Sequence, residues 1–156
     1  MRTVVVVTST AVVAAILGGG AFLLAQDKAG APAAPIPTSA EARAVLAGVV
    51  EAARAGELTA ACAFASEEDT CAWQTEAAPV VPAEVPTVTC EEEYTPGMPH
   101  TAGRILHLTG QRTDGTEYQA EFFVTTTSAG ARAVTPVYWT APTVQRVAGT
   151  PASTCG

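Results

Sequence analysis

Few side chains in this sequence have the type and spacing that catalysis requires. General acids and bases in small domains are usually Glu, His or Tyr side chains that face a cavity. Glu92, His107 and Tyr138 lie in segments with the alternation of β-strands. Each could serve in acid–base chemistry only if its strand turned it toward an interior pocket. We therefore assign no catalytic residue and keep these three as candidates.

Strand periodicity predicts where two of the candidates point, because alternate residues of a strand face opposite sides of the sheet. Glu92 is an even number of residues from Val88 and from Tyr94, so it should lie on the same face of the strand as these two, and we expect it to point toward the core. His107 stands between two leucines. If both leucines face the core, the histidine points outward and is a surface or hydrogen-bonded structural residue, which we favour. If Ile105 faces the core instead, the histidine points inward with it.

The four cysteines are the other chemically reactive side chains, and all follow the N-terminal apolar run: Cys62, Cys71, Cys90 and Cys155. In an oxidising compartment an even number favours two disulfides, with three possible pairings. We favour Cys62 with Cys71, which closes a short loop, and Cys90 with Cys155, which would attach the C-terminal tail. A Cys155 without an internal partner would instead be available to form a covalent dimer.

Spacing along the chain gives no indication of a metal, a cofactor or an activated nucleophile. The sequence has no C-x-x-C pair, and neither His100 nor His107 stands at finger or helical spacing to a cysteine. No serine lies in a G-x-S-x-G turn, and there is no phosphate-binding loop. The sequence therefore predicts neither a metal site nor a cofactor.

The charge pattern is acidic, with a net charge of −7. No basic residue lies between Arg54 and Arg104. Phosphate backbones need clustered Lys and Arg, so nucleic acid is excluded as a partner. The acids are expected to form a solvated face, with a cation site or a basic partner surface as the alternatives. Those between the two arginines include Glu67, Glu68, Asp69, Glu76, Glu84, Glu91, Glu92 and Glu93.

The N-terminal run Val4–Ala25 contains no charged residue. As a helix it would extend roughly 33 Å, enough to cross a hydrocarbon core of about 30 Å. Arg2 before the run favours a cytoplasmic N-terminus. We therefore expect residues 1–26 to anchor a single-pass protein in the cell membrane, with its C-terminal domain outside the cytoplasm. A cleaved signal segment and a secreted protein are the alternative.

The residues that follow predict a linker and two helices. Residues 27–38 are rich in Pro and Ala and read as a semi-rigid spacer. Thr38 and Glu41 fit a capping box at the start of a helix that Gly56 would end. A second helix is expected over Glu57–Ala65. Apolar residues recur at helical spacing in the first helix at Val45, Leu46, Val49, Val50 and Ala53.

From Pro86 onward the pattern changes to the two-residue period of strands. Asp114-Gly115 and Ser128-Ala129-Gly130 are turn signals. Helices followed by strands indicate an α+β domain over residues 39–142, with a helical hairpin packed on a curved antiparallel meander, and a tail over 143–156. The expected strands are Thr87–Tyr94, Arg104–Gln111, Glu117–Thr127 and Ala131–Thr140.

This order of elements, with the closing segment Ala133–Trp139 (AVTPVYW), resembles the NTF2-like (cystatin-like cone) superfamily. More narrowly, it resembles small exported or membrane-anchored actinobacterial proteins. The resemblance covers Ser39–Thr140 and implies a cone-shaped α+β fold. The superfamily includes enzymes with acid–base groups in a cone pocket and non-catalytic modules beside membrane complexes. The helical layer here is shorter than in the enzymes.

Three functions follow as expectations. The first is a non-catalytic, membrane-anchored domain that binds an envelope protein or a small apolar ligand. The second is an exported enzyme that uses Glu92, His107 or Tyr138. The third is a structural domain that self-associates as a homodimer through its open sheet face. The filling of the space between helices and sheet distinguishes the first two.

Overall fold

The structure, a computed structural model, describes residues 34–67, 71, 80–96, 101–140 and 152–155. The chain divides into the units Met1–Pro32 and Ala33–Gly156, and all described residues belong to the second. The expected anchor, residues 27–33 of the linker, and His100 lie outside the described residues. Within the described part, no helix has the length and apolarity to cross a membrane.

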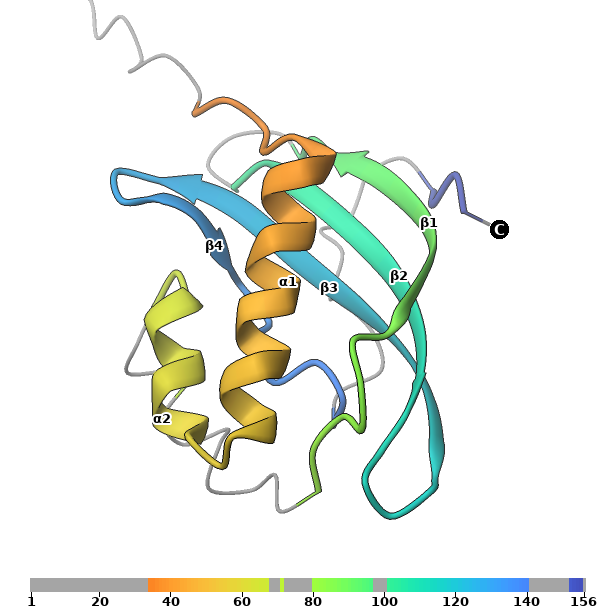
Figure 1. Cartoon of the computed structure of the whole chain (residues 1–156). Coiled ribbons are helices and arrows are strands. Elements are labelled where there is room, and N and C mark those ends of the chain that lie inside the picture. The colour runs from red at the N-terminus through yellow and green to blue at the C-terminus, as the bar shows by residue number, and fades with distance from the viewer. Residues whose placement is uncertain (1–33, 68–70, 72–79, 97–100, 141–151, 156) are drawn as a thin grey trace, which may run out of the picture. The chain divides into compact units, whose positions relative to one another are not determined.

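The described part of the domain has an α+β fold, as predicted, with two helices and an open antiparallel sheet in the order β1-β2-β3-β4. Figure 1 shows α1 crossing one face of the curved sheet, with α2 beside it. This is the predicted helical hairpin on a meander. The elements are α1 (Ser39–Arg54), α2 (Leu58–Ala61), the 3-10 turn η1 (Cys62–Phe64), β1 (Thr87–Tyr94), β2 (Gly103–Gln111), β3 (Glu117–Thr127) and β4 (Gly130–Ala133).

Helix α1 begins where the capping box was predicted. The Thr38 hydroxyl accepts a hydrogen bond from the Glu41 amide at 3.3 Å, and the Glu41 carboxylate accepts one from the Thr38 amide at 2.8 Å. The Thr38 hydroxyl also donates to the Glu41 carboxylate at 2.7 Å, and this bond, with that from the Thr38 amide, holds the pKa of Glu41 below its ordinary value. After the helix, Gly56 takes a φ of 78°, a left-handed conformation that glycine adopts without strain.

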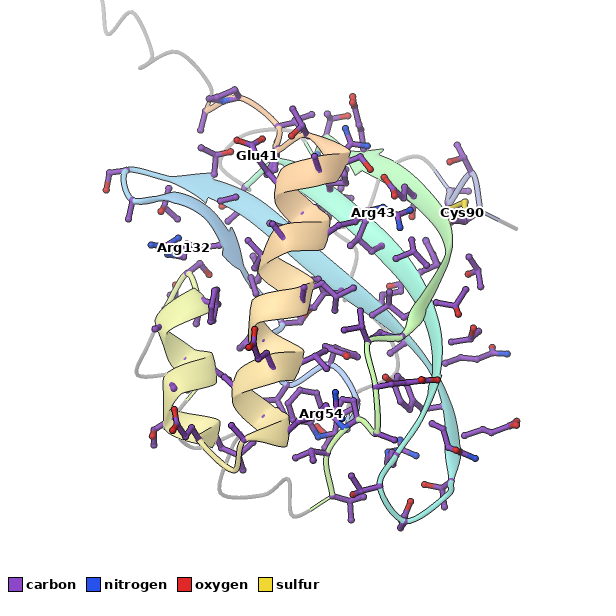
Figure 2. The ribbon with its side chains drawn as sticks, in the orientation of Figure 1. Glu41, Arg43, Arg54, Cys90 and Arg132 are labelled. Carbon is purple, nitrogen blue, oxygen red and sulfur yellow. A yellow bond between two sulfur atoms is a disulfide. The ribbon has the colours of Figure 1, made fainter. Side chains whose placement is uncertain are left out.

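A charged contact joins α1 to the first strand. Arg43 Nε donates to Glu91 Oε1 at 2.7 Å, and the position of Arg43 on α1 is visible in Figure 2. Partial burial raises the pKa of Glu91, but hydrogen bonds from Ser39 and Arg43 outweigh it and lower the pKa. The start of α1 is thus attached to β1.

The strands follow the prediction except for the last. β1 and β3 have the predicted bounds, and β2 begins one residue earlier than predicted. The prediction of a strand to Thr140 was wrong, because β4 ends at Ala133. Pro136 lacks the amide hydrogen that a ladder needs. Residues 136–140 form turns instead, and these bring Tyr138 and Trp139 into the core.

The predicted second helix is also shorter than expected. α2 ends at Ala61, and the chain continues as a 3-10 turn to Phe64. A disulfide between Cys62 and Cys71, the favoured pairing, closes this region. The Ser66 amide then donates to the Ala133 carbonyl at 2.8 Å, so that the chain after η1 covers part of the free edge of β4.

Both faces of the sheet are covered by packed side chains. Between α1 and the sheet lie Leu46, Phe122, Tyr138 and Trp139, each at most 1% exposed. On the opposite face Tyr94, Ile105 and Phe123 form a second apolar cluster, with the Tyr94 and Phe123 rings edge to face at 5.3 Å. We refer to these as the helix-side face and the far face.

Replacing Leu46 with alanine should lower the free energy of unfolding by about 2–5 kcal/mol, since it leaves a cavity under α1. Urea unfolding followed by circular dichroism measures the loss. Val85, which is 51% exposed, provides the control, and Val85→Ala should change stability by less than about 0.5 kcal/mol. Equal losses in the two variants would contradict the described core.

Candidate functional site

A bulge in β1 determines which side chains meet on the far face. The pairing with β2 shifts between Val88 and Cys90, leaving Thr89 as the extra residue. Val88 packs against the helix-side core, whereas Glu92 lies opposite Ile105 on the far face. The prediction that Val88 and Glu92 share a face was wrong, because an extra residue reverses the parity of the strand. Glu92 is nevertheless buried, at 8% exposure.

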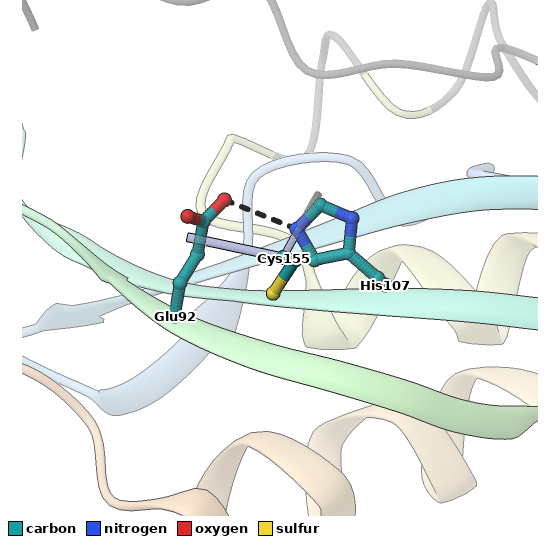
Figure 3. Close-up of side chains that lie close together, drawn as sticks. All are labelled: Glu92, His107 and Cys155. Atoms are coloured by element: carbon teal, nitrogen blue, oxygen red, sulfur yellow. Dashed lines mark hydrogen bonds and ion pairs between the residues drawn. The ribbon is translucent and has the colours of Figure 1, made fainter. Parts of the chain in front are cut away.

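His107 occupies the centre of this face. Its neighbours Leu106 and Leu108 pack on the helix side, so the imidazole points away from α1, as predicted. The side chain is 20% exposed, and its two ring nitrogens face two carboxylates. Nε2 lies 3.0 Å from Glu92 Oε1, and Nδ1 lies 3.6 Å from Glu121 Oε1. Figure 3 shows the contact with Glu92. His107 is therefore a hydrogen-bonded residue of this face.

The C-terminal tail provides the remaining partners of Glu92. The Thr154 amide donates to Oε2 at 2.9 Å, and the Ser153 hydroxyl donates to Oε1 at 3.1 Å. The Thr154 hydroxyl lies 3.5 Å from Oε2. Both carboxylate oxygens thus have donors, as a buried carboxylate requires.

A disulfide secures the same contact. Cys155 bonds to Cys90, the second favoured pairing, and the Cα atoms are 5.8 Å apart. Cys90 stands two residues before Glu92 on β1, and Figure 2 places it beside the tail. A covalent bond and a buried carboxylate therefore hold the tail to one strand. We call this group the tail clamp: Cys90, Glu92, His107, Ser153, Thr154 and Cys155.

Three potential metal ligands meet within the tail clamp. One ligand atom each from Glu92, His107 and Cys155 lies within 4.8 Å of the others. Figure 3 shows the three side chains converging from β1, β2 and the tail. Sequence spacing did not reveal this group, because its members come from distant parts of the chain. The favoured Cys90–Cys155 pairing was the one signal that placed the tail near Glu92.

Tyr138, the third candidate, lies apart from the other two. Its side chain is 0% exposed in the helix-side core, whereas Glu92 and His107 occupy the far face. Burial raises the pKa of Tyr138 far above its ordinary value, and the neighbouring Tyr118, with its hydroxyl 3.5 Å away, adds to the shift. Its neutral hydroxyl is a packing group, so the three candidates do not form one site.

A polar groove of 520 Å³ lies at the end of the β2–β3 hairpin. Among the lining residues that the structure describes, two are acidic and none is basic. Tyr118 contributes its hydroxyl, and burial raises the pKa of that group. We call this the acidic groove: Glu84, Thr87, Thr109, Gly110, Gln111, Glu117, Tyr118 and Gln119.

Arg112 supports the floor of the acidic groove. Its guanidinium carbon lies 5.2 Å from the centre of the Tyr118 ring. Its nitrogens donate to the Trp139 carbonyl at 2.6 and 3.2 Å. Arg112 directly follows β2 and connects it to the buried turn that contains Trp139. The groove residue Tyr118 therefore lies over well-packed structure.

Comparison of this chain with known protein families, with characterised proteins and with solved structures finds no match. A functional proposal therefore depends on the filled core, the tail clamp and the acidic groove.

Replacing Glu92 with alanine should release the tail and lower the free energy of unfolding by about 1.5–3 kcal/mol, because hydrogen bonds to a buried charge are lost. Urea unfolding measures this change. Glu93→Ala is the matched control: that side chain is 59% exposed and pairs with Arg104, so its loss should cost less than about 1 kcal/mol. Similar costs for the two variants would show that Glu92 is not a buried acceptor.

The two disulfides should differ in their contributions to stability. Cys90 and Cys155 are separated by 65 positions, and Cys62 and Cys71 by 9. Restricting the longer loop removes more entropy from the unfolded chain. Cys90→Ser/Cys155→Ser should therefore cost about 2 kcal/mol more than Cys62→Ser/Cys71→Ser. Guanidinium unfolding of both double variants tests this, and an equal or reversed order would contradict it.

Proposed function

We propose that this chain is a non-catalytic, membrane-anchored domain that binds a protein partner at the cell envelope. The proposed anchor is Val4–Ala25, and the proposed architecture of the domain is NTF2-like. The observation that carries the non-catalytic part of the proposal is the filled space between α1 and the sheet. There Phe122, Tyr138 and Trp139 occupy the volume that a cone pocket would need.

The placement of the acid–base candidates supports the same proposal. Catalysis in a cone pocket would require a proton-transfer group that faces a substrate cavity. Tyr138 is enclosed beside Tyr118, and Glu92 receives hydrogen bonds from the tail. His107 lies between Glu92 and Glu121. The three candidate side chains thus take part in packing and in holding the tail, and we infer no proton-transfer role for them.

The acidic groove is the proposed surface for the partner. Glu84 and Glu117 place two carboxylates along it, in a chain with a net charge of −7. Complementary charge steers association and selects partners. A basic, extended protein segment fits this lining, and the polar side chains favour such a segment over a small apolar ligand.

The occupied far face favours a different protein as the partner over a second copy of this chain. Self-association through the sheet would need an open face, and the tail residues Ser153 and Thr154 already bind to Glu92 there. The acidic groove also lacks self-complementarity, since two copies would bring like charges together.

Crosslinking in cells tests the proposal. The full chain, carrying a photoreactive amino acid at Gln119 in the acidic groove, should give one discrete adduct with another protein in its native envelope. A probe at the exposed Ala44 on α1 is the control and should give none. Glu84→Lys/Glu117→Lys should reduce the Gln119 adduct more than about tenfold, because like charges repel the basic segment.

Three results would overturn the proposed function. The first is an adduct that contains only a second copy of the chain, which would indicate self-association. The second is an equal yield from the Ala44 and Gln119 probes. The third is an adduct at Gln119 that the double charge reversal leaves unchanged.

A further inference from the structure

The tail clamp brings together more ligand chemistry than holding a tail requires. Thr154 and Ser153 alone satisfy both oxygens of Glu92. Yet His107 Nε2 and Cys155 Sγ also lie within 4.8 Å of that carboxylate, and Cys90 Sγ is bonded to Cys155. One carboxylate oxygen, one imidazole nitrogen and the Cys155 sulfur therefore lie within 4.8 Å of one another, and the disulfide brings a second sulfur, that of Cys90, beside them.

We propose that reduction of the Cys90–Cys155 disulfide converts the tail clamp into a four-coordinate site for Zn²⁺. The ligands are the thiolates of Cys90 and Cys155, Nε2 of His107 and one oxygen of Glu92. The inference is independent of the proposed protein partner, because none of the four ligands lines the acidic groove.

The ligand types select the ion. Thiolate and imidazole ligands in tetrahedral arrangement suit Zn²⁺, whereas Ca²⁺ and Mg²⁺ take oxygen ligands. Two sulfurs among four ligands therefore exclude the hard cations. Two thiolates and one carboxylate carry three negative charges, which a divalent ion neutralises in large part.

The reduction that opens the site is a balanced thiol–disulfide exchange. A dithiol reductant gives two electrons and two protons: its sulfurs form a new disulfide, the Cys90–Cys155 bond breaks, and both cysteines become thiols. Zn²⁺ then replaces the two thiol protons, which pass to solvent. Disulfide and metal are thus alternative states of the same two sulfurs.

The nitrogen and oxygen ligands need only small movements. Bonds of about 2.0 Å in a tetrahedron place the nitrogen and oxygen ligands about 3.3 Å apart. His107 Nε2 and Glu92 Oε1 are 3.0 Å apart, so they must separate by a few tenths of an ångström. The two sulfurs must move from their bonded distance to about 3.8 Å apart, the separation that bonds of about 2.3 Å give in a tetrahedron. Their Cα atoms are 5.8 Å apart, and both side chains can rotate once the bond is broken.

A second carboxylate lies near the other ring nitrogen of the histidine. Ligating histidines usually donate their second ring N–H to a carboxylate, which fixes the tautomer and orients the ring. Glu121 Oε1 lies 3.6 Å from His107 Nδ1 and can take this role. The Thr154 amide, 2.9 Å from Glu92 Oε2, holds that oxygen in place, and the ion would take Oε1 by displacing the Ser153 hydroxyl that now donates to it.

Cobalt titration tests the site, since Co²⁺ reports tetrahedral thiolate coordination through its visible and charge-transfer absorption. The full chain with Cys62→Ser/Cys71→Ser, in detergent micelles, is reduced with a phosphine and titrated without oxygen. We expect one Co²⁺ per chain, displaced by Zn²⁺, and no such spectrum before reduction. If the Cys62→Ser/Cys71→Ser variant does not fold, the reduced wild-type chain is compared with the reduced Cys90→Ser/Cys155→Ser variant. The latter should bind one Co²⁺ fewer per chain.

Variants separate the proposed ligand set from binding by thiols alone. His107→Gln should weaken Zn²⁺ binding more than about tenfold. Glu121→Gln should weaken it about 10- to 100-fold, because the Glu121 carboxylate would orient the histidine. Glu93→Gln, at an exposed position next to Glu92 that pairs with Arg104, should leave Zn²⁺ affinity unchanged. The inference is overturned if reduced chain binds no Co²⁺, if oxidised chain binds equally well, or if His107→Gln binds with wild-type affinity.

Discussion

The structure depends on one buried carboxylate. Glu92 is 8% exposed and sits on a sheet face whose other members include Tyr94 and Ile105. A carboxylate in such surroundings is costly unless its oxygens receive hydrogen bonds. Its donors come from the C-terminal tail and from His107, so burial of Glu92 and attachment of the tail require each other. The Cys90–Cys155 disulfide keeps the donors close when the bonds open.

This constraint explains how a small domain covers both faces of an open sheet. Helix α1 buries the helix-side face with an amphipathic stripe that includes Leu46 and Val49. The far face has its own aromatic cluster at Tyr94 and Phe123, and tail residues that bind beside it. Two disulfides add stability that a core of this size supplies only in part.

Much of the fold could be predicted from local patterns, and the site could not. The capping box at Thr38 and the alternation in β1 and β3 are local signals, and the structure confirms their bounds. Both disulfides follow the favoured pairing. The bulge at Thr89 leaves no mark in the alternation, so the prediction placed Glu92 on the face of Val88. The turns after Ala133 depend on tertiary packing of Trp139, which outweighs strand propensity.

Amide hydrogen exchange at Thr154 tests the central claim most directly. Thr154 lies near the C-terminus, where the chain ends usually fray and backbone amides exchange with little protection. If its amide donates to a buried Glu92, its protection should approach that of the β2 amides in the sheet. Exchange at the rate of an unstructured tail, with the disulfide intact, would show that the carboxylate does not hold the tail and would contradict this account.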